Sequence, residues 1–151
     1  MRSLALLTAA LFVGPAAAAD KKATKDEEAI VGKWQAEGMD DGSGRKPPAD
    51  LLEKLWVRFQ TDGKGVLPGP DGKERAFAFK LDPAAKLKAI DLDPDGRTPG
   101  LGLYSLDGDT LVLVLPSSQN ETKTRPTDLK PVAKATVAIT YKRVKDEKKD
   151  R

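Results

Sequence analysis

Apolar and polar residues alternate along several short segments of this chain. The segment 77–81 reads Phe-Ala-Phe-Lys-Leu, and the same period of two recurs at 55–60 and 137–142. Successive side chains of a β-strand point to opposite faces, so this period predicts strands with one buried face. The segment 111–115 reads Leu-Val-Leu-Val-Leu, which predicts a central strand with apolar residues on both faces.

Turn signals divide the chain at intervals of roughly ten residues. Asp-Gly pairs stand at 62–63, 71–72, 95–96 and 107–108. Glycine takes positive φ at little cost, and an Asp side chain bonds the neighbouring backbone, so each pair favours a tight turn. Together the two patterns predict eight strands, near residues 30–36, 55–60, 64–67, 76–82, 86–92, 101–106, 110–115 and 135–143.

These strands predict an all-β fold. Eleven Pro and thirteen Gly residues disfavour long helices, and we expect at most one short helix, at residues 48–54. Strands that follow one another without a helical crossover pair antiparallel, and closing the sheet removes its exposed edges. We therefore predict an antiparallel up-and-down meander of about eight strands that forms a small β-barrel. A flattened sandwich of the same strands is the alternative.

Residues 1–19 have the features of a secretory signal peptide. Arg2 provides a positive charge, residues 4–13 are apolar except for Thr8, and residues 16–19 are all Ala. We expect cleavage after Ala19 and export of the product, which is then periplasmic or secreted. The apolar run is shorter than the roughly 20 residues that cross a bilayer, so we expect no membrane span after cleavage.

Charged segments flank the expected domain. Residues 20–28 and 145–151 carry charges of both signs and no large apolar residue, so they are expected to be a flexible leader and a flexible tail. The domain then spans residues 29–144. The 26 basic and 23 acidic residues give a net charge of +3, which falls to +2 when Arg2 leaves with the signal peptide. Because the two signs are interspersed, nucleic acid is not an expected partner.

The chain contains no Cys and no His. It therefore lacks disulfides, thiol nucleophiles, Ser-His-Asp triads and zinc sites of the usual nitrogen and sulfur type. An exported domain without disulfides depends on its core for stability. We expect neither an enzyme nor a cofactor, and we assign no catalytic residue and no metal ligand.

An ordered series of motifs resembles one known family. The motifs are Gly32-Lys33-Trp34, the segments 79–83, 89–92 and 102–111, Arg125-Pro126-Thr127, and a last strand that ends at Arg143. Over residues 28–144 this series is similar to the lipocalin-like domain of uncharacterised secreted proteins from planctomycete-type bacteria. The resemblance implies a lipocalin-like barrel. It implies no catalytic residues, because the family has no established activity.

The resemblance also implies a structural role for Trp34. In lipocalin barrels the Trp of the first strand closes one end, and an Arg of the last strand stacks on its ring. Arg143 stands at the matching place, in phase with Val137, Ile139 and Tyr141. We expect Trp34 and Arg143 to form a structural barrel plug that includes a cation–π contact.

Four other polar residues stand at motif-like positions: Asp91, Asp107, Asp109 and Arg125. Asp107 and Asp109 flank a predicted hairpin turn, where such side chains face water and bond backbone amides. Arg125 lies in the irregular connection before the last strand, which it can pin to the barrel through a carboxylate such as Asp91. We interpret all four as structural residues.

The segment 91–96 also matches the Asp-x-Asp-x-Asp-Gly that opens a calcium loop. The remainder of the loop does not fit. Its twelfth position is Gly102 where a bidentate Glu is required, and Pro99 and Gly100 interrupt it. We predict a plain strand-to-strand turn without a metal.

Two functions remain open. An eight-stranded barrel can enclose one small apolar ligand, here of unknown identity, and small residues such as Ala36, Ala89 and Ala135 on its inner face would leave room. The alternative is a non-enzymatic structural or protein-interaction module whose core is filled by its own side chains. The sequence identifies neither the ligand-binding residues nor a protein partner.

Overall fold

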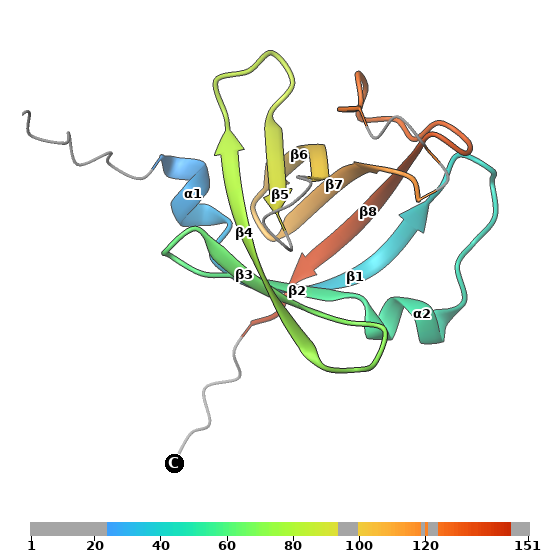
Figure 1. Cartoon of the computed structure of the whole chain (residues 1–151), viewed down its shortest axis with the longest axis horizontal. Coiled ribbons are helices and arrows are strands. Elements are labelled where there is room, and N and C mark those ends of the chain that lie inside the picture. The colour runs from blue at the N-terminus through green and yellow to red at the C-terminus, as the bar shows by residue number, and fades with distance from the viewer. Residues whose placement is uncertain (1–23, 94–99, 119, 121–123, 146–151) are drawn as a thin grey trace, which may run out of the picture.

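Eight antiparallel strands form a closed barrel in the computed structural model, which describes residues 24–93, 100–118, 120 and 124–145. The strands follow one another around the barrel in chain order, and β8 pairs with β1 to close it (Figure 1). The predicted up-and-down meander is therefore confirmed. Because β1 and β8 are hydrogen-bonded, the sheet is a barrel and not a flattened sandwich.

The strands lie close to their predicted positions. Their bounds are β1 (Gly32–Asp40), β2 (Trp56–Phe59), β3 (Lys64–Pro68), β4 (Glu74–Asp82), β5 (Ala89–Asp93), β6 (Gly100–Asp107), β7 (Thr110–Pro116) and β8 (Thr136–Arg143). β1 is longer than predicted because it continues through a bulge between Ala36 and Gly38. Beyond the bulge Met39 stands opposite Ile139, so Met39 follows Ala36 on the inner face.

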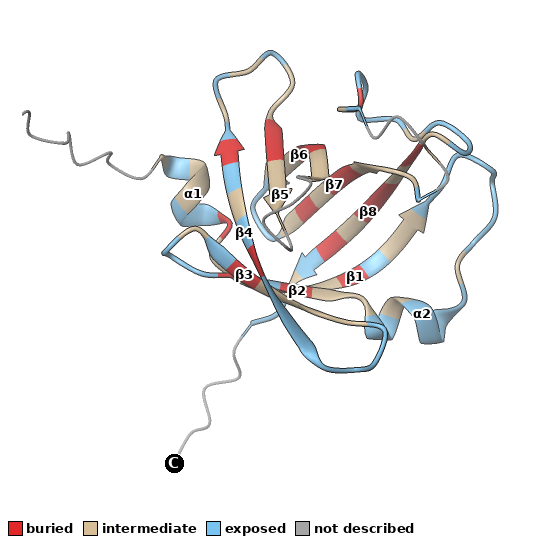
Figure 2. Cartoon of the chain, in the orientation of Figure 1, coloured by how far each residue is buried: buried red, intermediate tan, exposed pale blue. Residues whose placement is uncertain are grey.

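Alternation along the strands separates an inner from an outer face. Leu111 and Leu113 of β7 stand opposite Tyr141 and Ile139 of β8, and all four are buried. Figure 2 shows the same alternation as red bands along these strands. The inner face supplies most of the buried core, together with Ile30: Trp34, Ala36, Val57, Phe59, Phe77, Leu81, Ile90, Tyr104, Leu111, Leu113, Ile139 and Tyr141.

A second, smaller cluster lies on the outer face of the barrel. It consists of Leu103, Val114 and Ala138, with Val114 opposite both of the other two. β7 is therefore buried on both faces, as its uninterrupted apolar sequence predicted.

Two short helices accompany the barrel in the described residues, one more than expected. Helix α2 (Ala49–Lys54) lies within the predicted range, and the Gln35 side chain of β1 donates to the carbonyl oxygens of Leu52 (2.7 Å) and Leu55 (3.0 Å) beside it. Helix α1 (Lys25–Ala29) precedes β1. In the part of the chain that the structure describes, neither helix is long and apolar enough to cross a membrane.

Within the described residues, helix α1 differs from the flexible leader expected at 20–28, since the chain is helical from Lys25 to Ala29. A capping box begins the helix: the Glu27 amide donates to Thr24 Oγ1 (3.2 Å), and the Glu27 carboxylate accepts from the Thr24 amide (2.6 Å). A helix of five residues is not stable by itself, so contacts with the barrel must hold it. Ile30, directly after the helix, is fully buried.

Some expectations fall outside the described residues. They concern the signal peptide at 1–19, the calcium-like turn at 94–96, and the tail from 146 onward.

Candidate functional site

The two ends of the barrel are built differently. The closed end contains the first residues of β1 and the last residues of β8, and α1 lies against it (Figure 1). The open end contains the last residues of β1, β3, β5 and β7 and the first residues of the other four strands. Any ligand that enters the interior along the barrel axis without displacing α1 must pass the open end.

Arg143 connects the closed end to α1. Its guanidinium carbon lies 4.2 Å from the centroid of the Trp34 ring, so the contact implied by the resemblance is present. The Nη1 and Nη2 groups donate to the carbonyl oxygens of Val31 (2.9 Å) and Ala29 (2.5 Å), and Nε donates to the Asp109 carboxylate (3.2 Å). One side chain thus binds the Trp, the end of α1 and the β6–β7 turn.

Gly32 makes room for this arrangement. Its φ is +130°, and a Cβ at this position would lie 3.1 Å from Nη1 of Arg143. The Gly of the Gly-x-Trp motif is therefore needed both for its backbone conformation and for the arginine. The Trp34 indole nitrogen donates to the Ile30 carbonyl oxygen (2.8 Å), which adds a further link to the end of α1.

A partly buried cluster holds the other side of α1. The Asp26 carboxylate accepts hydrogen bonds from the Tyr104 hydroxyl (2.7 Å) and the Lys88 ammonium (2.7 Å). Burial by itself raises the pKa of a carboxyl, but these two bonds outweigh it, so the pKa of Asp26 lies below its ordinary value of 3.8. Burial and the Asp26 carboxylate raise the pKa of Tyr104. Nothing in the sequence pattern indicated this cluster, because its members are 62 and 78 residues apart.

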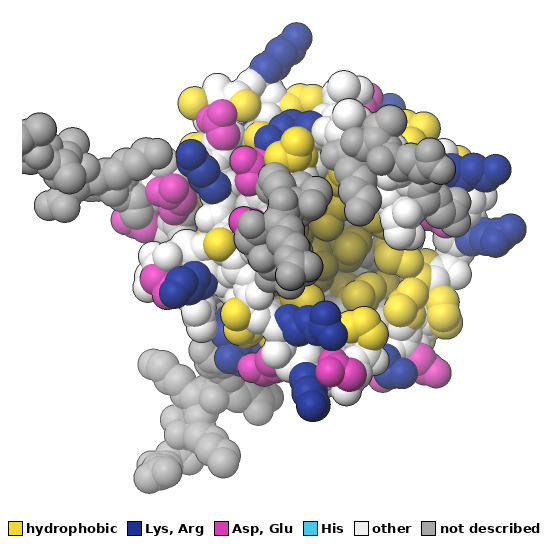
Figure 3. Space-filling model, viewed as in Figure 1, with side chains coloured by type: hydrophobic (Ala, Val, Ile, Leu, Met, Phe, Trp, Pro, Cys, Tyr) yellow, Lys and Arg dark blue, Asp and Glu magenta, His cyan; other side chains and the backbone are white. Residues whose placement is uncertain are grey.

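Apolar side chains line the inside of the open end. They occupy the second position from that end on five strands: Met39, Leu67, Leu92, Leu115 and Val137. Each is partly exposed, whereas the inner-face residues Trp34, Phe59 and Leu111 toward the closed end are at most 1% exposed. The space-filling view shows a hollow lined by hydrophobic side chains on this part of the molecule (Figure 3).

Bulky side chains fill the interior below the open end. The rings of Phe59, Phe77 and Phe79 pack with centroids 4.9–6.4 Å apart. Gly65, opposite Phe77, leaves the space that the Phe77 ring occupies. At Gly100, by contrast, the nearest described atoms to a Cβ are those of Leu92, at 3.4 Å or more, which is ordinary van der Waals contact.

The apolar surface of the open end continues outside the barrel. A shallow hollow of about 200 Å³ adjoins the end of β1. Met39, Pro47, Pro48 and Leu51 form its apolar lining, and the charged residues Asp41, Arg45 and Lys46 line it as well. Leu51 is 38% exposed. Met39 therefore belongs both to the interior and to this outer rim.

The contact expected between Arg125 and Asp91 is present. Arg125 Nη2 donates to Asp91 Oδ1 (2.5 Å), and Nη1 donates to the carbonyl oxygens of Gly102 (2.7 Å) and Ile90 (3.3 Å). These bonds attach the β7–β8 connection, residues 117–135, to β5 and β6. The pair thus has the structural arrangement that the sequence indicated.

The four motif-like polar residues form two separate sets. Asp109 was expected to face water and bond backbone amides, but its carboxylate binds Arg143 and Lys145 (3.7 Å) at the closed end. Asp107 is exposed at the end of β6. Asp91 and Arg125 lie on the outer face, so no constellation of all four forms. In the described ranges, no group of three or more Asp and Glu residues could hold a metal ion.

Only one of the three small residues expected on the inner face lies there. Ala36 is buried in the inner core. Ala89 stands opposite Leu103 of the outer cluster, and Ala135 precedes β8, so both expectations are wrong. In β5 the predicted inward-facing positions are wrong by one residue, because Ile90 and not Ala89 points inward.

No family model matches this chain, and neither a curated protein nor a solved structure matches it. The fold and its two ends therefore define the class: a small up-and-down β-barrel protein with one plugged end and one apolar, open end.

Proposed function

We propose that this protein is an exported, lipocalin-like binding protein that holds a small apolar ligand in the open end of its barrel. The ring of five partly exposed apolar side chains inside that end carries the proposal. Apolar surface gains roughly 25 cal/mol for each Å² removed from water, so a ligand that covers this ring is stabilised there. The motifs from Gly32 to Arg143 support membership of the secreted lipocalin-like family, and residues 1–19 support export.

The ligand is expected to be apolar where it enters the barrel. Arg75 is opposite Leu67 at the open end, but its side chain lies over the backbone of Gly69, with Nε 2.5 Å from the position of a Cβ there. Arg75 also pairs with Asp71 at 3.9 Å. The Arg75 side chain is therefore directed to the β3–β4 turn and not into the interior.

A structural or protein-interaction module is the second candidate. It is supported by the packed lower part of the interior, where Phe59, Phe77 and Tyr104 are nearly inaccessible to solvent. This candidate predicts that the open end binds no apolar molecule.

Titration with the neutral fluorescent probe N-phenyl-1-naphthylamine distinguishes the two candidates. The variant Gly100→Leu adds a side chain at the level of the ring, and we expect it to weaken probe binding at least about tenfold. Gly38→Leu is the matched control, because Gly38 is opposite Thr140 on the outer face and has no atom within 4 Å of a Cβ. Absence of saturable binding, or equal affinity in both variants, would leave the structural module as the function.

Native mass spectrometry of protein purified from its own host identifies the ligand class. A retained lipid or metabolite is expected as an added mass that is lost on denaturation. The same spectrum gives the mass of the mature chain, which is expected to begin at Asp20.

A further inference from the structure

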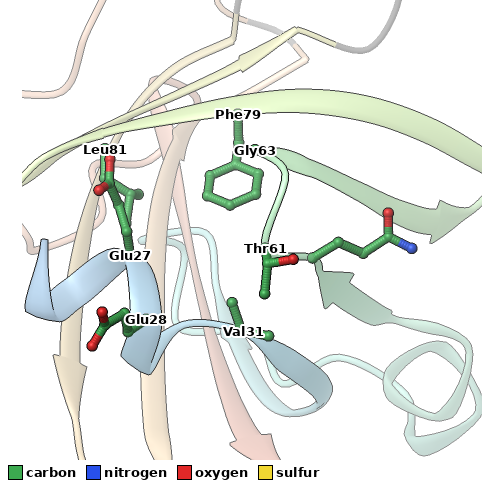
Figure 4. Close-up of a pocket in the computed structure, with 8 residues that line it drawn as sticks. Glu27, Glu28, Val31, Thr61, Gly63, Phe79 and Leu81 are labelled. Carbon is green, nitrogen blue, oxygen red and sulfur yellow. The ribbon is translucent and has the colours of Figure 1, made fainter. Parts of the chain in front are cut away.

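A separate hollow of about 230 Å³ lies beneath α1 at the closed end (Figure 4). Its lining includes Val31, Phe79 and Leu81 on the apolar side and Glu27, Glu28 and Thr61 on the polar side. This volume is below the roughly 300–1,000 Å³ of pockets for drug-sized ligands, so it suits a smaller molecule.

The apolar side of the hollow includes an aromatic ring. Phe79 is on the inner face of β4 and packs nearly perpendicular to Phe59, at 79° with a centroid distance of 4.9 Å. In Figure 4 its ring points toward α1 and Val31. Because Phe79 is only partly buried, a molecule in the hollow can contact the ring.

Among the residues that the structure describes, the polar side of the hollow carries two carboxylates and no basic residue. The Glu27 carboxylate holds the Thr24 amide in the capping box. The exposed Glu28 side chain makes no hydrogen bond or ion pair with any residue that the structure describes. The third acidic residue of the helix, Asp26, is already bound to Lys88 and Tyr104.

We propose that this hollow binds a small organic cation of the alkylammonium class. A positive nitrogen is attracted by the carboxylates of Glu27 and Glu28 and by the face of an aromatic ring such as Phe79. The alkyl groups on the nitrogen cover Val31 and Leu81. An anion would be repelled by the two carboxylates, and a bare metal ion would leave the apolar floor in contact with water.

This site differs from the proposed ligand site, because Glu27 and Glu28 of α1 line it and the five ring residues do not, although Phe79 of its lining stands opposite Leu92 of the ring. Choline and its neutral isostere 3,3-dimethylbutan-1-ol are suitable probes, since they share one shape and differ in charge. We expect choline to shift the amide NMR signals of Thr61, Gly63 and Val31 in a saturable manner. The alcohol is expected to bind at least about fivefold more weakly, because it lacks the charge.

The double variant Glu27→Gln with Glu28→Gln tests the carboxylates and keeps a capping-box side chain at residue 27, because Gln also accepts the hydrogen bond of the Thr24 amide. We expect it to weaken choline binding at least about fivefold. Glu53→Gln, a carboxylate of α2 outside the hollow, is the matched control and is expected to bind choline like the unmodified protein.

Three results would each overturn the proposal: no saturable shift up to about 100 mM choline, equal affinity for choline and the alcohol, or unchanged affinity in the double variant. None of them affects the naphthylamine titration, which reports on the open end.

Discussion

Replacing Arg143 with Ala removes four contacts of one side chain at the closed end. The cation–π contact with Trp34 is worth about 1 kcal/mol at a partly buried site. The two hydrogen bonds to the carbonyl oxygens of Ala29 and Val31 together contribute about 2 kcal/mol. The ion pair with Asp109, whose side chain is half exposed, contributes about 0.5 kcal/mol. Because neighbouring contacts are not strictly additive, we expect a loss of about 3 kcal/mol in the free energy of unfolding.

Urea unfolding followed by circular dichroism measures this loss of free energy. In thermal unfolding, the Tm is expected to fall by about 10–15 °C. Arg143→Met separates the causes, because it keeps an apolar stem on Trp34 and removes only the charged contacts. Arg143→Lys retains the charge but cannot bond two carbonyl oxygens with a planar fork, so it is expected to recover less than half of the loss. If Arg143→Ala changed the stability by less than about 0.5 kcal/mol, the plug interpretation would be wrong.

Two further predictions concern the other anchored segments. The pKa of Asp26 is lowered in the folded protein, so its contribution to stability is complete above a pH of about 4 and is lost as the pH falls through the folded pKa. The unmodified protein is therefore expected to lose stability over this acid range more steeply than Asp26→Asn. If the urea midpoints of the two proteins differed by the same amount at every pH from about 2 to 7, this prediction would be wrong. Arg125→Ala loses the bonds to Asp91 and Gly102, and we expect about 1–2 kcal/mol of destabilisation. Hydrogen exchange of the β7–β8 connection should accelerate first; unchanged exchange there would refute the pinning role.

The strands could be predicted from the sequence because their signal is local. A period of two depends on the direction of successive side chains, and an Asp-Gly turn depends on two neighbouring residues. Helix α1 had a local signal as well, in the spacing of Thr24 and Glu27 that forms its capping box. The charged composition of residues 20–28 nevertheless predicted a flexible segment. A helix this short is stable only through contacts with the barrel, and composition does not show those contacts.

Contacts between distant residues account for what the pattern did not predict. Arg143 reaches the carbonyl oxygen of Ala29 across 114 positions, and Tyr104 reaches Asp26 across 78. The inward phase of β5 and the bulge in β1 also depend on neighbouring strands, since a shift of one residue moves a side chain to the opposite face.

The order of strands, their antiparallel pairing and the exclusion of Cys and His chemistry thus follow from the sequence alone, because each rests on residue types or on near neighbours. The plugged end, the apolar open end and the acidic hollow beneath α1 exist only in the closed barrel. Closure pairs the first strand with the last and determines which apolar side chains are covered by packing and which remain for a ligand.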